Sequence, residues 1–128
     1  MSDLPKVVVT DFITEPLEFE RSVLDGHADV TALNATSEEE LEGQIEDADA
    51  IMVYHYFKIS RSTIERLENC KVIVRPGVGY DGVDIEAARE KGIPVCNVPD
   101  YGTEEIADSA LAMALSLARG THFLNSRL

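Results

Sequence analysis

Residues 71–98 read KVIV RPGVGYDGVD IEAAREK GIPVCNV, which is a β-branched run, a glycine-containing loop, a helical stretch and a second β-branched run. Gly92 directly follows the helical stretch Ile85–Lys91, and glycine readily adopts the left-handed conformation that ends many helices. The run Ile93–Val98 after it is expected to be a short, buried strand. These features predict a unit of strand, helix and strand in which the two strands run parallel.

The same alternation extends over the whole N-terminal part of the chain. Short runs rich in β-branched residues recur at intervals, and each predicts a strand. The five runs are Lys6–Thr10, Ala28–Thr31, Ala50–Tyr54, Lys71–Val74 and Ile93–Val98.

Two capping boxes lie between these strands, Ser37 with Glu40 and Ser62 with Glu65. In a capping box the serine and the glutamate satisfy backbone amides at the helix start, so helices are expected to begin at Glu38 and at position 63. Five strands joined by right-handed crossovers give an α/β fold, a flavodoxin-like parallel sheet with helices on both faces.

A final helix differs from the others because much of its circumference is apolar. Thr103 is expected to cap it, and Glu104 and Glu105 suit its positive N-terminal end. Its apolar residues are Ile106, Ala107, Ala110, Leu111, Ala114, Leu115, Leu117 and Ala118. Such a helix needs a partner surface, and little of this chain is left to supply one.

The composition is that of a single acidic domain. The 128 residues are 45% hydrophobic and carry a formal net charge of −13. Residues 1–50 hold 14 acidic and 2 basic side chains, whereas residues 51–128 are nearly neutral. A net-acidic surface repels phosphate backbones and anionic lipids, so neither a nucleic acid nor a membrane is an expected partner. No apolar run approaches the roughly 20 residues that cross a bilayer.

The cysteines and two of the histidines suggest no metal or redox chemistry. Cys70 and Cys96 match no Cys-x-x-Cys spacing, and no basic, apolar signal segment precedes them. Both are expected to be reduced core thiols in a cytoplasmic protein. His27 and His122 have no metal-ligand spacing with each other or with a cysteine, so no metal site is expected.

Three loops at the carboxyl ends of the predicted strands are candidates for a binding site, because ligands of open parallel sheets bind there. They are Tyr54-His55-Tyr56, the loop 75–81, and the segment 99–102 with Tyr101. His55 is a candidate base or hydrogen-bond donor, although a lone histidine at a strand end is more often structural. Tyr101 could offer a phenol to the same pocket.

The loop after the fourth strand contains Gly77, Gly79 and Gly82 at the G-x-G-x-x-G spacing of dinucleotide-binding sites, with an acidic residue about 20 positions on. Asp81 and Asp84 would stand where the negative pyrophosphate must bind, which argues against that interpretation. A small organic acid suits the loop better, because open backbone amides and the adjacent Arg75 can hold a carboxylate. The alternative is a plain tight turn with Arg75 paired to a surface carboxylate.

The segments 75–84 (RPGVGYDGVD) and 92–108 (GIPVCNVPDYGTEEIAD) resemble the D-isomer-specific 2-hydroxyacid dehydrogenases. Within that family the chain is most similar to the branch of the C-terminal-binding-protein corepressors and phosphoglycerate dehydrogenase-like proteins, through 52–55 (MVYH), 72–75 (VIVR) and 95–99 (VCNVP). The corepressor branch usually has serine where Val78 stands.

The resemblance implies an NAD-dependent oxidoreductase that acts on the CH–OH group of a 2-hydroxy acid, or on the matching 2-keto acid. Residues 1–101 would form the substrate-binding domain. Residues 102–128 would form a hinge helix and the start of a nucleotide-binding domain. That domain is missing here, so NAD would be bound mainly elsewhere and this chain alone would be inactive. The complete protein would be a homodimer.

The resemblance also assigns residues to the site. Arg75 with the backbone of Gly77, Val78 and Gly79 would hold the substrate carboxylate, and the pocket would be lined by Tyr54, His55 and Tyr101. Val78 and Ile106 would lie near the nicotinamide. No catalytic residue is assigned within this chain, because the family's catalytic arginine, glutamate and histidine come from the second domain.

Three other functions fit parts of the sequence. The first is a non-enzymatic, corepressor-like module that binds short peptides. The second is a phosphorylation-dependent receiver domain, which needs an aspartate, a serine or threonine and a lysine where this chain has Tyr54-His55, Arg75 and Asn97. The third is a standalone NAD-binding domain, which needs the loop 77–82 to hold a pyrophosphate.

Overall fold

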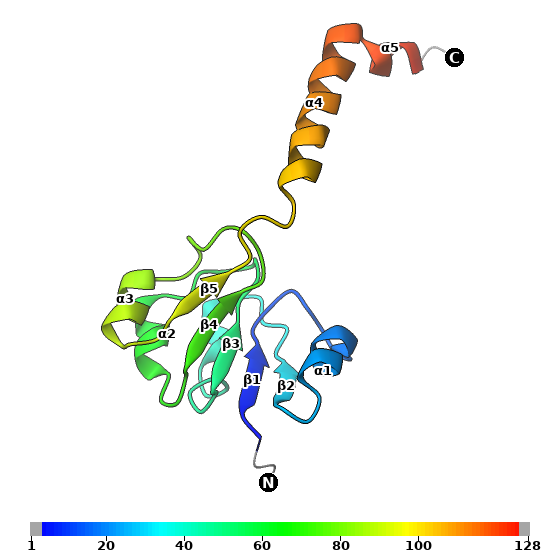
Figure 1. The fold of residues 1–128 in the computed structure, drawn as a ribbon. Helices are drawn as coiled ribbons and strands as arrows, with labels where there is room; N and C mark the ends of the chain where they lie inside the picture. Colours follow the sequence, from blue (N-terminus) through cyan, green and yellow to red (C-terminus); the bar gives the residue numbers. More distant parts are fainter. Residues whose placement is uncertain (1–3, 126–128) are drawn as a thin grey trace.

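A computed structural model describes residues 4–125 and contains a five-stranded, fully parallel sheet. The strands are β1 (Lys6–Val9), β2 (Asp29–Ala32), β3 (Ala50–Met52), β4 (Val72–Arg75) and β5 (Val95–Asn97). Their order across the sheet is β2-β1-β3-β4-β5, the flavodoxin-like order (Figure 1). All five strands predicted from the sequence are therefore confirmed.

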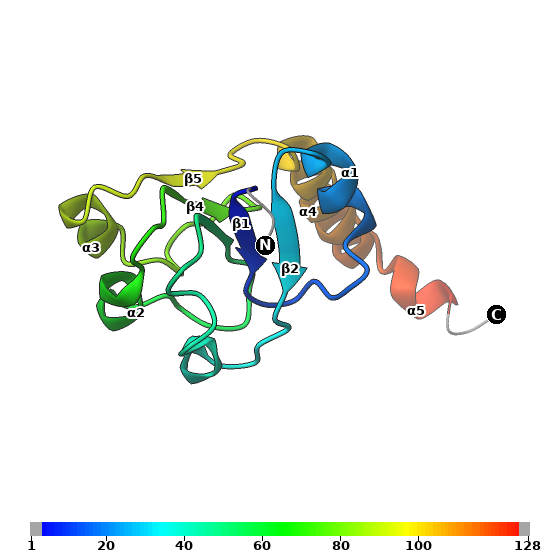
Figure 2. The ribbon, with the colours of Figure 1, turned by 90° about the horizontal axis from the view of Figure 1, so that it is seen from below.

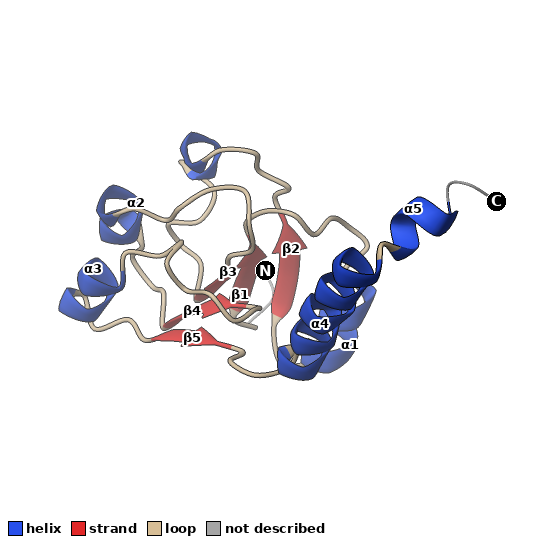
Figure 3. Ribbon diagram, turned by 90° about the horizontal axis from the view of Figure 1, so that it is seen from above, coloured by secondary structure: helices blue, strands red, loops and turns tan. Residues whose placement is uncertain are grey.

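The helical segments lie between the strands and after the last one. They are α1 (Glu18–Leu24), the 3₁₀ helix η1 (Glu38–Leu41), α2 (Arg61–Arg66), α3 (Ile85–Glu90), α4 (Thr103–Arg119) and α5 (Thr121–Asn125). Gly92 adopts φ 77° after Lys91, the C-cap residue of α3, as expected from its position. Seen from below and from above, α1 lies on the side of the sheet opposite α2 and α3 (Figures 2 and 3).

The predicted helix starts at the capping boxes are only partly right. The first segment begins at Glu38 but is a short 3₁₀ helix. Neither half of the capping box forms, because the Ser37 side chain makes no capping bond and Glu40 accepts from Thr36 instead of Ser37. The second helix begins at Arg61 rather than at position 63. Its N-cap residue is Ser60, whose amide and hydroxyl both donate to Glu38, so a tertiary contact replaces the local box.

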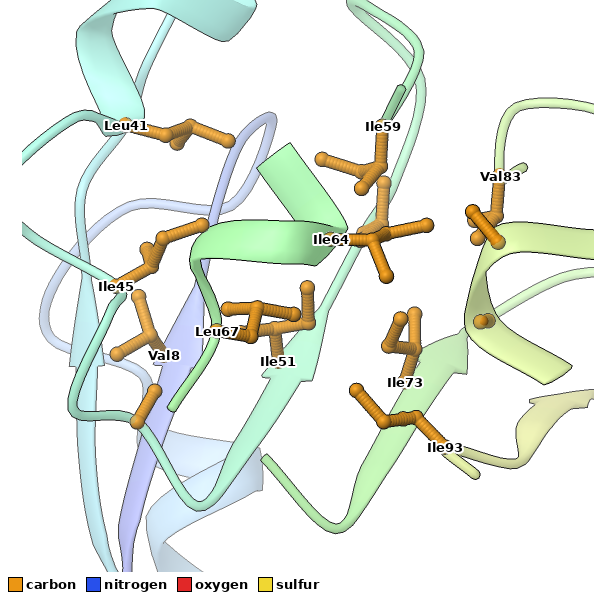
Figure 4. Close-up of a cluster of buried hydrophobic side chains, with 14 of the residues drawn as sticks. Val8, Leu41, Ile45, Ile51, Ile59, Ile64, Leu67, Ile73, Val83 and Ile93 are labelled. Atoms are coloured by element: carbon orange, nitrogen blue, oxygen red, sulfur yellow. The ribbon is translucent and has the colours of Figure 1, made fainter. Parts of the chain in front are cut away.

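The main core lies between the sheet and the layer of η1, α2 and α3. Parallel register aligns Val8, Ile51 and Ile73 across β1, β3 and β4, and all three side chains are fully buried. They pack against further buried side chains that include Leu41, Ile45, Ile64, Leu67 and Ile93 (Figure 4). Burial of this apolar row is the main favourable contribution to folding.

The other face of the sheet is covered unevenly. Leu17 and Leu24, at either end of α1, pack over the β1 and β2 side chains Val7, Val9 and Val30. Farther along this face, Val72 and Val74 on β4 stay half-buried, and Cys96 on β5 is exposed. The expectation of a buried fifth strand and of a core thiol at Cys96 is therefore wrong, because β5 is an edge strand whose second face has no cover within residues 4–125.

Helix α4 projects from the body of the domain (Figure 1). Every residue from Thr103 to Arg119 is exposed, including Ile106, Leu111 and Leu117 at 67%, 62% and 71%. The helix begins at Thr103 itself, with Gly102 in the N-cap position, so the predicted threonine cap is wrong. No helix within residues 4–125 is long and apolar enough to span a membrane.

We expect this exposed helix to make the isolated chain self-associate. Leu111 and Leu115 lie one turn apart and are 62% and 63% exposed, so replacing both with glutamate puts two charges on the apolar surface. Sedimentation velocity at rising concentration is expected to show association of the natural chain and a monomer for Leu111→Glu/Leu115→Glu. The control Ser109→Glu is expected to associate as the natural chain does, and a natural chain that stays monomeric would contradict the prediction.

Candidate functional site

A buried carboxylate organises the carboxyl end of the sheet. Asp11 follows β1 and is 0% exposed, and its oxygens accept three consecutive backbone amides from the loop after β3. Tyr54 N lies 2.8 Å from Oδ1, while His55 N and Tyr56 N lie 2.6 Å and 2.8 Å from Oδ2. The Thr10 hydroxyl lies 2.7 Å from Oδ1. The loop after β3 is thus tied to the buried segment that follows β1.

These hydrogen bonds keep Asp11 ionised. Burial by itself raises the pKa of a carboxyl group, but the donors at Tyr56, Tyr54, Thr10 and His55 outweigh it and leave the pKa of Asp11 below its usual value. The negative charge is therefore balanced by N–H and O–H dipoles, with no cationic side chain needed.

Aromatic rings gather around the same loop. Phe12 has a left-handed backbone conformation (φ 68°), and its ring centroid lies 4.9 Å from that of His55, 5.9 Å from that of Tyr54 and 5.8 Å from that of Tyr56. Burial, with the nearby charges of Glu20 and Asp11, raises the pKa of the Tyr54 phenol. The Tyr54 hydroxyl therefore stays protonated at neutral pH and can donate a hydrogen bond.

Arg75 ends β4 and meets His55 from the neighbouring strand. Its Nη2 lies 3.0 Å from His55 Nδ1. Arginine can only donate, so Nδ1 accepts and the ring proton of a neutral imidazole sits on Nε2. Arg75 makes no salt bridge with a carboxylate anywhere in residues 4–125, which removes the alternative of an arginine paired to a surface acid.

The glycine turn after β4 is shaped by the arginine and by β5. A Cβ on Gly77 would lie 1.5 Å from Arg75 Nη1, so the guanidinium folds back over this residue. Asn97 Nδ2 donates to the Val78 carbonyl at 2.7 Å, and Val98 N donates to the Gly77 carbonyl at 3.0 Å. Of the described residues, none accepts a hydrogen bond from the Val78 or Gly79 amide, so both amides are available to a ligand.

A hollow of about 280 Å³ lies between these loops. Tyr54, His55, Tyr56 and Arg75 line it, together with Lys58 and Asp81. Asp81 also approaches Gly79, because a Cβ there would lie 3.1 Å from Asp81 Oδ1. The site thus offers cationic and neutral donors with one carboxylate at its border, which suits a small acid better than a polyanion.

The structure does not gather all of the predicted site residues. Tyr54, His55 and Arg75 share one pocket, and the turn Gly77-Val78-Gly79 adjoins it through the Arg75 guanidinium. Tyr101 lines a separate hollow with Asp100, Thr103, Glu104 and Glu105. Ile106 is 67% exposed on α4 and Val78 is 44% exposed.

The glycine spacing lacks the geometry that a pyrophosphate needs. Gly77, Gly79 and Gly82 all avoid the left-handed region, so none uses the conformational freedom of glycine. Asp84 accepts the Ala87 amide at 2.9 Å and so occupies the start of α3 with its own carboxylate. A diphosphate would meet negative charge at the place where a dinucleotide site presents free amides.

Sequence reasoning missed Asp11, Phe12 and Asn97. Asp11 carried a usable signal, because it is an acidic residue directly after an apolar strand whose carboxyl end lies at the binding edge. Phe12 carried none, since its left-handed backbone is visible only in the structure. Asn97 was compared with a receiver-domain lysine, whereas its amide anchors the glycine turn.

A flavodoxin-like sheet with an arginine, a histidine and open amides at its carboxyl edge defines an α/β domain suited to binding a small acid. The chain belongs to the D-isomer specific 2-hydroxyacid dehydrogenase family, whose catalytic-domain model matches residues 7–123.

Curated relatives and a solved structure agree with this membership. D-3-phosphoglycerate dehydrogenase of Methanocaldococcus jannaschii is 38% identical over 113 residues, which is 88% of this chain and 22% of that protein. C-terminal-binding protein 1 of Caenorhabditis elegans is 36% identical over 81% of this chain and 14% of its own length. The NAD⁺-bound 3-phosphoglycerate dehydrogenase of Entamoeba histolytica matches with a TM-score of 0.74 and 31% identity, over 88% of this chain and 39% of that one. The chain therefore spans only a minor part of each relative.

We expect Asp11→Asn to lower the free energy of unfolding by about 3 kcal/mol, because an amide cannot accept all three backbone bonds and turns a donor toward them. The pKa of Asp11 is depressed in the folded state, so its stabilising effect is complete above the unfolded value near 3.8 and is lost as the pH falls through the lower native value. Urea unfolding of both proteins from pH 7 to pH 2 is expected to show a difference that shrinks below pH 3.8. A difference that grows on acidification would contradict this account.

We also expect Gly77→Ala to displace the Arg75 guanidinium while the fold survives. The backbone of Gly77 tolerates alanine, and the atom that must give way is the end of a flexible side chain. The ¹⁵N shifts of the His55 ring are expected to show that Nδ1 has lost the hydrogen bond from Arg75. The control Gly82→Ala, where the nearest atom is 3.9 Å away, should leave these shifts unchanged. An unchanged His55 spectrum in Gly77→Ala would show that the guanidinium does not lie over this glycine.

Proposed function

We propose that this chain is the substrate-binding part of an NAD-dependent D-2-hydroxyacid dehydrogenase, which moves a hydride between a 2-hydroxy acid or its 2-keto form and a nicotinamide. The observation that carries the proposal is the contact of Arg75 with His55 at the carboxyl edge of the sheet. The adjoining turn adds the Val78 and Gly79 amides, which have no acceptor among residues 4–125. The family of the chain and the dehydrogenase names of its relatives support the same activity.

The residues of this chain bind and orient the acid. Arg75 carries the positive charge that pairs with the carboxylate, and the amides of Val78 and Gly79 donate further hydrogen bonds. The Nε2–H of His55 and the Tyr54 hydroxyl are donors for the hydroxyl or keto oxygen at C2 of the substrate. Asp81, at the border of the pocket, disfavours additional negative charge there. These contacts hold the acid in one orientation while its reacting carbon stays exposed to the cofactor.

The nicotinamide cofactor would supply the site that accepts or gives the hydride. The chain's own glycine turn does not fit the pyrophosphate, so we assign nucleotide binding to a further domain of the complete protein. Val78 and Ile106 are exposed apolar side chains that could contact the nicotinamide ring. The catalytic groups of the reaction would come from the same further domain, and this chain would be inactive by itself.

We divide the chain into a substrate-binding domain, residues 1–101, and residues 102–128, which form a hinge helix and the start of the nucleotide-binding domain. The exposed apolar surface of α4 supports this division, because a connecting helix would be covered by the domain that follows it. A homodimer and a cytoplasmic location are further proposals for the complete protein. The free thiols of Cys70 and Cys96 favour a reducing compartment.

A second candidate function is a non-enzymatic module that binds short peptides, as in the corepressor-like branch. The 36% identity to C-terminal-binding protein 1 favours it. Binding of a peptide together with an absence of 2-keto acid binding would support this candidate over the first.

The charge on Arg75 is expected to decide acid binding. In an NMR titration with pyruvate, shift changes should concentrate at residues 54–56 and 77–79, and Arg75→Ala should weaken binding roughly 10- to 100-fold through the loss of charge-assisted hydrogen bonds. The control Arg89→Ala removes an exposed arginine that pairs with Glu86, and it should bind pyruvate normally. Joined to a nucleotide-binding domain, Arg75→Ala should raise KM for the 2-keto acid and leave nucleotide affinity nearly unchanged.

Three results would contradict the proposed function. The first is normal pyruvate affinity in Arg75→Ala. The second is an equal loss of substrate and nucleotide affinity in the joined protein. The third is micromolar binding of NAD by the 128-residue chain, which would assign the loop 77–82 to nucleotide binding.

A further inference from the structure

The pocket residue His55 stands on a loop that the sheet does not hold. Strand β3 ends at Met52, and Val53 N still donates to the Val74 carbonyl at 2.9 Å. The next three amides, of residues 54–56, have left the ladder and all point to Asp11. The path of this loop therefore depends on one carboxylate from the segment that follows β1.

The carboxylate is itself fixed in place. The Thr10 hydroxyl donates to Asp11 Oδ1, and the Thr10 amide donates to the Met52 carbonyl at 2.9 Å. Thr10 and Asp11 are both 0% exposed. Because neither residue can move without opening the core, the positions of the three loop amides are fixed relative to β1.

Phe12, the next residue along the chain, contacts the side chains of the same loop. Phe12 follows Asp11 in a left-handed conformation that brings its ring edge-on to His55, with centroids 4.9 Å apart. His55 is thus held through its amide by Asp11 and through its ring by Phe12 and Arg75. Asp11 and Phe12, which lie in the segment after β1, thus contact the backbone and the ring of the histidine respectively.

We propose that Asp11 is a positioning residue of the substrate site: its carboxylate sets the loop 54–56 so that the His55 ring meets Arg75 in the geometry that binds the acid. Asp11 does not line the pocket, so we assign it no direct contact with the acid. This inference rests on the proposed function, since it names what aligns the histidine with the arginine.

A matched carboxylate elsewhere in the fold separates positioning from simple stability. Glu38 accepts from Ser60 N at 2.6 Å, from the Ser60 hydroxyl at 2.7 Å and from the Thr63 hydroxyl. It therefore fixes the start of α2 as Asp11 fixes the loop, but it does not line the pocket. Burial raises its pKa and these donors lower it, with a lowered pKa as the net result, as for Asp11.

The experiment compares Asp11→Asn with Glu38→Gln in the 128-residue chain, at a temperature where circular dichroism shows both to be folded. Both variants are expected to melt earlier than the natural chain. Only Asp11→Asn is expected to change the ¹⁵N shifts of the His55 ring and to weaken pyruvate binding, roughly tenfold, because a small misplacement of a binding group is costly. Thr10→Val, which removes the hydroxyl that orients Asp11, should give a smaller change in the same direction and serves if Asp11→Asn fails to fold.

The inference would be overturned if Asp11→Asn kept the His55 ring shifts and the pyruvate affinity of the natural chain. If only Thr10→Val folds, the same result in that variant would overturn it. Equal losses in Glu38→Gln would also overturn it, because stability alone would then explain them. If the natural chain binds no pyruvate, the proposed function fails, and the His55 ring shifts still decide whether Asp11 aligns the histidine with Arg75.

Discussion

The parallel pairing of β3 between β1 and β4 is the constraint on which the rest of the molecule depends. Register places Val8, Ile51 and Ile73 in one buried row, so the sheet acquires a face on which η1, α2 and α3 can pack. The same parallel direction brings the ends of the three strands to one edge. Asp11, His55 and Arg75 come from three separate parts of the chain, and they meet because each one follows or ends one of these strands.

The site combines a rigid, buried hydrogen-bond network with an exposed contact between two flexible side chains. Asp11 is buried, ionised and surrounded by donors, whereas the Arg75 to His55 contact is exposed and made by flexible side chains. An incoming carboxylate can therefore rearrange the guanidinium at little cost while the loop beneath keeps its path. Preorganised backbone with adaptable charge is an economical way to bind a small acid, because most of the ordering entropy is lost during folding.

Much of the fold could be predicted from the sequence, because β-branched runs and the glycine after α3 are local signals. Helix starts were less predictable, since Ser60 bonds to Glu38, a residue 22 positions away, and no local pattern reports that. The closeness of Arg75 and His55 could be predicted, because both lie at the carboxyl ends of predicted parallel strands, and these ends share one edge of the sheet. The position of Asp11 after the first strand also indicates this edge, but its burial and its three amide partners could not be predicted, because they come from a loop more than 40 residues away. Tyr101 was grouped with the pocket by its position after the fifth strand, but it lies in a separate hollow beside the start of α4.

Phe12 combines a strained backbone conformation with the ring contacts that hold the pocket loop. A non-glycine residue at φ 68° costs about 1 kcal/mol or more relative to an ordinary conformation, and glycine would relieve that strain. Glycine would also remove the ring that packs on His55, Tyr54 and Tyr56. Exchanging Phe12 for glycine would therefore trade a strained backbone for a histidine whose ring keeps Arg75 but loses its edge-on contact, so the strain and the alignment of the pocket come together at one residue.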